Sequence, residues 1–130
     1  MFSHLIVKFL LTCIIFAVVI DACQVTVKLR SKTKNKFRVQ VYVPSIEQKS
    51  EKILFTKPGD KKITVTGENC ARLPWVVRTW KQNEQGEWIH AKEVKAKLDG
   101  RGWLRVIVGD DYMPFFMDRS GVSCSEGFCG

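Results

Sequence analysis

The stretch VTVKLRSKTKNKFRVQVYV (residues 25–43) alternates apolar and polar side chains on both sides of a polar centre. A period of two is typical of β-strands that bury one face and expose the other. Residues 25–29 and 37–43 are therefore predicted to be strands. The segment SKTKN between them carries no large apolar side chain, so we expect it to form the tip of a hairpin.

The rest of the chain continues this strand pattern. Short alternating, β-branched or aromatic runs occupy residues 52–57, 63–66, 75–81, 88–98, 103–108 and 112–117. The sequences PGD (58–60), NEQG (83–86) and DGRG (99–102) are predicted turns between them. No segment shows a helical apolar stripe with capping residues. The chain is therefore predicted to be all-β, an antiparallel β-sandwich of about seven strands with immunoglobulin-like architecture.

The first 22 residues have the organisation of a secretory signal peptide. The cation Lys8 precedes the apolar run Phe9–Ile20, and small Ala22 stands just before the expected cleavage site. The run has about 12 residues where a membrane span needs about 20, so no retained span is expected. Cleavage leaves a secreted chain, residues 23–130, whose length suits a single domain. A bacterial lipoprotein is an alternative, since a cysteine follows directly, but Asp21 fits that signal poorly.

Cleavage also changes the number of cysteines from five to four, because it removes Cys13. An even number supports an oxidising destination and a fold stabilised by two disulfides. Four cysteines permit three pairings, and the sequence alone does not exclude any of them. The favoured pairing is Cys23–Cys70 with Cys124–Cys129, whose short loop contains Gly127.

The predicted mature chain keeps the net charge of +8, since the signal segment holds one cation and one anion. Such a charge favours anionic partners, which for a secreted protein are extracellular glycans or acidic protein surfaces rather than nucleic acid. In the opening stretch a cation stands at every second position, so these side chains share one solvent-facing side of a strand. The predicted polyanion-binding strip is Lys28, Arg30, Lys32, Lys34, Lys36 and Arg38. The alternative interpretation is a solvated face that only protects an edge strand from aggregation.

A small apolar-ligand carrier is the second function that the sequence allows. A lipid pocket between the two sheets would be lined by Trp103, Phe115 and Phe116. Large aromatic side chains more often fill the core of a small protein, which is the competing interpretation. A protease inhibitor or antimicrobial effector is a third hypothesis, and it rests only on the cysteines and the positive charge.

The sequence does not predict an enzyme. After signal removal His90 is the only histidine, and the chain has no Gly-x-Ser-x-Gly motif that would place a nucleophile near it. A single histidine and oxidised cysteines do not make a zinc site. We therefore expect no metal and no cofactor, and we expect a monomer.

Several motifs along the chain resemble small secreted nematode proteins of uncharacterised function. The motifs are CQVTVK (23–28), KPGDKK (57–62), Pro74-Trp75, KAKLDG (95–100) and DRSGVSCSEGFCG (118–130). The resemblance implies an extracellular, β-rich protein and identifies no functional residue.

Overall fold

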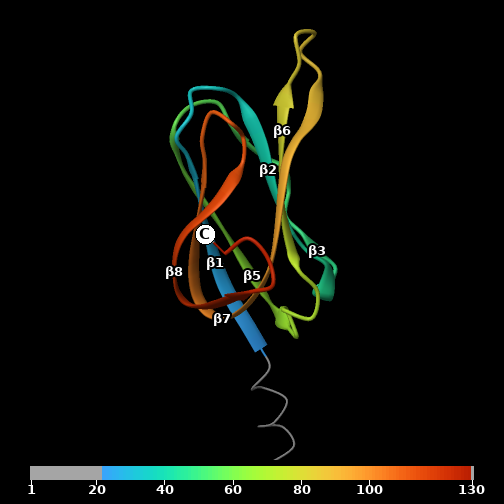
Figure 1. The fold of residues 1–130 in the computed structure, drawn as a ribbon, viewed down its shortest axis with the longest axis vertical. Helices are drawn as coiled ribbons and strands as arrows, with labels where there is room; N and C mark the ends of the chain where they lie inside the picture. Colours follow the sequence, from blue (N-terminus) through green and yellow to red (C-terminus); the bar gives the residue numbers. More distant parts are fainter. Residues whose placement is uncertain (1–21, 130) are drawn as a thin grey trace, which may run out of the picture.

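The structure is a computed structural model that describes residues 22–129, so apart from Ala22 the predicted signal peptide lies outside the described residues. This part is all-β, as expected (Figure 1). Its strands are β1 (Ala22–Ser31), β2 (Phe37–Val43), β3 (Gln48–Lys49), β4 (Ile53–Phe55), β5 (Gly59–Glu68), β6 (Trp75–Gln82), β7 (Trp88–Val108) and β8 (Pro114–Ser125), with one 3-10 turn, η1 (Pro44–Ile46). Within residues 22–129, none of the helical segments has the length and apolarity needed to span a membrane.

All the strands belong to one sheet, and β7 is the strand that unites it. The order is β3-β2-β6-β7-β1-β5, with β4 also paired to β2 and β8 also paired to β7. The first part of β7 pairs antiparallel with β6, and its second part pairs parallel with β1. The prediction of an antiparallel two-sheet sandwich is therefore wrong. The sheet is mixed and strongly curled into a half-barrel, with β2 and β6 in one half and β1 and β5 in the other (Figure 1).

The curl depends on the segment DGRG (99–102), which was predicted to be a turn between separate strands. In the structure β7 bends there without ending, because Asp99 and Gly100 remain paired to Ser123 and Val122 of β8. The two backbones approach closely at this corner. A Cβ atom on Gly102 would lie 1.8 Å from the carbonyl oxygen of Ser120. The bend is thus a feature of the hydrogen-bonded sheet, which is why the halves do not separate into two sheets.

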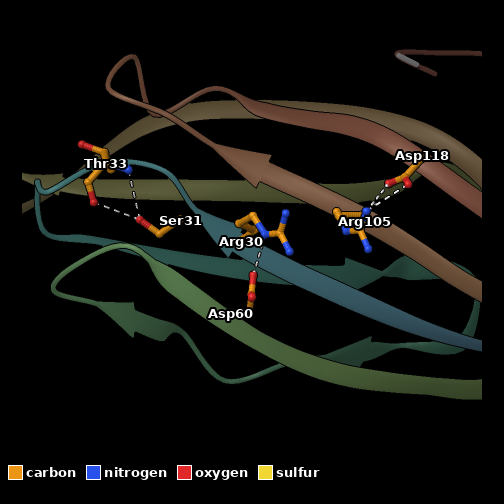
Figure 2. Close-up of polar contacts among 6 residues, drawn as sticks. All are labelled: Arg30, Ser31, Thr33, Asp60, Arg105 and Asp118. Atoms are coloured by element: carbon orange, nitrogen blue, oxygen red, sulfur yellow. Dashed lines mark hydrogen bonds and ion pairs between the residues drawn. The ribbon is translucent and has the colours of Figure 1, made fainter.

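The opening stretch contains both predicted strands, but they do not form a hairpin. Whereas β1 pairs with β5 and β7, β2 pairs with β3, β4 and β6. Residues 32–36 instead cross from one half of the sheet to the other. The crossing is fixed by local hydrogen bonds. Ser31 donates from its hydroxyl to the carbonyl oxygen of Thr33 at 3.1 Å, and the Lys32 amide donates to the carbonyl oxygen of Val108 at 2.9 Å. Figure 2 shows the contact between Ser31 and Thr33.

The alternation read from the sequence places the core on the inner side of the curled sheet. Val25, Val27 and Leu29 of β1 are at most 1% exposed, and β2 shows the same pattern from Phe37 to Val43. The polar residues between them face outward and are half-buried or exposed. Because the alternating apolar side chains of β1 and of β2 face the inner side, the outer side of each half is free to carry charge.

Two disulfides lie near the two ends of the described chain. They are Cys23–Cys70 and Cys124–Cys129, the pairs favoured from the sequence. The first joins the start of β1 to the loop between β5 and β6, where the Trp75 indole nitrogen donates to the Cys70 carbonyl oxygen at 3.0 Å. The second lies at the end of β8, which extends to Ser125, beyond the strand predicted at residues 112–117.

Candidate functional site

The structure distributes the predicted basic strip over three parts of the molecule. Lys28 and Arg30 lie on the outer side of β1, and Arg38 lies on the outer side of β2, in the other half of the sheet. The three lysines between them are exposed in the crossing segment: Lys32, Lys34 and Lys36. The cations therefore do not form one flat face. They follow the outer side of β1, the crossing segment, and then the outer side of β2.

A different set of cations does form a row across neighbouring strands. Lys28 of β1 is the register partner of Lys62 on β5 and of Arg105 on β7. Neighbouring strands are about 4.8 Å apart, so three positive side chains stand next to one another on the same outer side. Like charges in directly opposed positions destabilise a sheet, so such a row is unfavourable where no carboxylate balances it. The sequence analysis missed Lys62 and Arg105, because their position beside Lys28 depends on strand pairing.

Trp103 holds two members of this row against the sheet. The ammonium nitrogen of Lys28 lies 4.3 Å from the centre of the Trp103 ring, and the guanidinium carbon of Arg105 lies 5.3 Å from it. Cations are attracted to the face of an indole ring, most strongly where water is partly excluded. The half-buried ring thus restricts where the two cationic side chains can move.

Two carboxylates lie at the margin of the row. The Arg30 Nε donates to Asp60 at 2.7 Å, and an Arg105 terminal nitrogen lies 3.0 Å from Asp118 (Figure 2). The hydrogen bond from Arg30 holds the pKa of Asp60 below its usual value, and the same contact raises the pKa of Arg30. Lys28 and Lys62 form no ion pair with any residue in the described part of the chain.

Around the row the surface is hollowed. A depression of about 330 Å³ is lined by Lys28, Arg30, Asp60, Lys61, Lys62 and Arg105. We call the row, Arg30, Trp103 and the two carboxylates the β1 face. Five cations and one carboxylate around one depression can hold sulfate or carboxylate groups through charge-assisted hydrogen bonds, which arginine forms in bidentate geometry.

The predicted apolar pocket is not assembled. Phe116 is 1% exposed and points into the core, whereas Phe115 is 44% exposed and packs edge-on against Phe128. Trp103 lies on the outer side with Lys28 and Arg105 over its ring. The three side chains therefore do not line a common cavity, because neighbours on a strand point to opposite faces.

His90 lies on the surface, with its ring 6.2 Å from that of Trp80 in an edge-on arrangement. Across residues 22–129, no cluster of histidine, cysteine, aspartate and glutamate has the arrangement of a metal site.

Comparison with known proteins finds neither a matching family model nor a matching curated protein. The resemblance to small secreted nematode proteins therefore rests on the sequence motifs alone.

Proposed function

We propose that this protein is a secreted, non-enzymatic binding protein whose β1 face holds an anionic extracellular glycan. The observation that carries the proposal is the cross-strand row of Lys62, Lys28 and Arg105. A polyanion bound beside Lys28 and Lys62, which form no ion pair in the described part of the chain, relieves the repulsion that remains within this row. Two disulfides suit an oxidising, extracellular setting, where sulfated and carboxylated glycans are the abundant polyanions.

A glycan fits the β1 face better than a single small anion does. The cations extend across three strands, from β5 to β7, and a chain with repeated anionic groups engages them together. Each contact with an exposed lysine is weak and is screened by salt, so affinity depends on several contacts at once. The net charge of +8 adds a long-range attraction that raises the rate of encounter.

We predict that Lys28→Gln together with Lys62→Gln weakens heparin binding by about tenfold, because two charge contacts are lost. The measurement is the salt concentration at which the protein elutes from immobilised heparin, with affinity from titration. The matched control is Lys57→Gln with Arg72→Gln, which removes the same charge from exposed positions in the β4–β5 and β5–β6 loops, outside the β1 face. An equal loss in both pairs, or elution of the unaltered protein below physiological salt, contradicts the proposal.

Removal of a carboxylate from the β1 face has the opposite predicted effect. Asp60→Asn frees Arg30 and removes a negative charge from the depression, so we expect elution from heparin at higher salt. Lowering the pH from neutral to mildly acidic does not reproduce the effect of Asp60→Asn. The pKa of Asp60 is lowered, so its carboxylate stays ionised over this range. Glu84→Gln, in the turn between β6 and β7, is the control for net charge alone. If both variants shift elution equally, the effect does not come from the β1 face.

A further inference from the structure

The outer side of the other half of the sheet carries a second set of cations held over aromatic rings. The guanidinium carbon of Arg38 lies 4.3 Å from the centre of the Trp88 ring, and the Lys52 ammonium nitrogen lies 4.5 Å from that of Trp80. Trp80 also meets the edge of His90. We call this set, which lies on or beside β2, β6 and the first part of β7, the β2 face.

Strand pairing brings the β2 face together, as it does the β1 face. Arg38 on β2 is the register partner of Trp80 on β6, and Trp80 is the partner of His90 on β7. Gln82 pairs with Trp88, so Trp80 and Trp88 share the outer side of the hairpin. The two tryptophans are half-buried, and their rings fix the cations beside the sheet at low cost in side-chain entropy.

The nearby carboxylate is already used by other cations. Glu93 pairs with Arg78, which is its main partner, and its other oxygen lies 3.9 Å from Lys95. The hydrogen bond from Arg78 also lowers the pKa of Glu93, so this carboxylate remains ionised and engaged. Arg38 and Lys52 form no ion pair within residues 22–129, which leaves both charges available to a ligand.

We propose that the β2 face is a second site for anionic glycan, so that each molecule binds two glycan segments on its two outer sides. This inference rests on the proposed function and extends it from one site to two. The exposed lysines of the crossing segment, Lys32, Lys34 and Lys36, lie between the β1 face and the β2 face along the chain. A long glycan can therefore pass over the crossing segment from one site to the other, and two glycans can be linked by one protein.

Calorimetric titration with a short heparin-derived tetrasaccharide tests the second site. We expect two tetrasaccharides per molecule of the unaltered protein. In Lys28→Gln with Lys62→Gln we expect the affinity of one site to fall by about tenfold while the other site is unchanged, and in Arg38→Gln with Lys52→Gln we expect the reverse. A stoichiometry of one in the unaltered protein overturns the second site. If Lys28→Gln with Lys62→Gln weakens that single binding event by about tenfold, the proposed function still holds without the second site. Absence of any binding to the unaltered protein overturns the proposed function itself.

The half-buried Arg38 packs on Trp88, so its replacement by glutamine can also weaken the fold. Arg38→Lys with Lys52→Arg is the control, since it retains both charges and is expected to retain a stoichiometry of two. A second readout avoids the problem of folding altogether. Light scattering of the unaltered protein mixed with long-chain heparin is expected to rise to a maximum at an intermediate ratio, because bivalent proteins link several chains. Scattering that stays at the level of Lys28→Gln with Lys62→Gln overturns the second site.

Discussion

Replacement of both Cys23 and Cys70 by alanine is expected to lower the free energy of unfolding by about 4 kcal/mol, which is most of the stability of a domain this small. The two cysteines are 47 residues apart in sequence, so without the disulfide the unfolded chain regains the entropy of a long loop. Both side chains are fully buried, so alanine also leaves unfilled space in the core. The measurement is denaturant unfolding followed by tryptophan fluorescence.

The second disulfide supplies the matched comparison. Cys124 and Cys129 close a loop with a separation of only 5, and their replacement by alanine is expected to cost about 2 kcal/mol. Both side chains are only partly buried, so little core packing is lost. An equal loss in the two double variants contradicts the expectation. It would mean that the entropy which each disulfide removes from the unfolded chain does not depend on the length of the loop that it closes.

Gly102→Ala is expected to destabilise the protein by about 3–5 kcal/mol, or to prevent folding. The added methyl group would meet the carbonyl oxygen of Ser120 on the neighbouring strand, which is backbone and cannot rotate away. The corner of β7 must then open, and the curl that encloses the core is lost with it. Thermal unfolding measures the effect.

Gly59→Ala is the control for Gly102→Ala. Gly59 also lies in a strand, and a Cβ atom there meets nothing within 4 Å, so we expect a change of about 0.5 kcal/mol or less. If Gly102→Ala is tolerated as well as Gly59→Ala, the two strands do not need to approach closely for the sheet to bend.

The curled sheet relates the fold to the proposed function. A strand has two faces, and in this protein every described strand except the two-residue β3 uses one face for the enclosed core. The other face of each half points outward, so the β1 face and the β2 face lie on separate outer sides of one small molecule. In the predicted hairpin the strip from Lys28 to Arg38 would have formed a single binding surface. The crossing of residues 32–36 divides it between the two halves.

Local pattern was enough to locate the strands and much of the core. A side chain's position along a strand determines which face it takes, so the alternation at Val25–Leu29 and Phe37–Val43 identified buried and exposed residues correctly. The same rule placed Lys28, Arg30 and Arg38 on outer faces. Applied to the adjacent Phe115 and Phe116, the rule also places their side chains on opposite sides of β8, so the predicted shared pocket was already at odds with the strand pattern.

The sequence by itself determined that the chain is all-β and which cations face outward. It favoured, among three possible cysteine pairings, the one that the structure contains. Only the tertiary structure decided that the strands form one mixed sheet and that Lys62 and Arg105 stand beside Lys28. It also decided that Arg38 belongs to a second basic and aromatic face. The physical reason is that period-two alternation is a property of consecutive residues, whereas pairing between strands is decided by contacts far apart in the chain. The parallel pairing of β1 with β7 has no local signature, and the turn signal at DGRG (99–102) does not show that the strand continues through the bend.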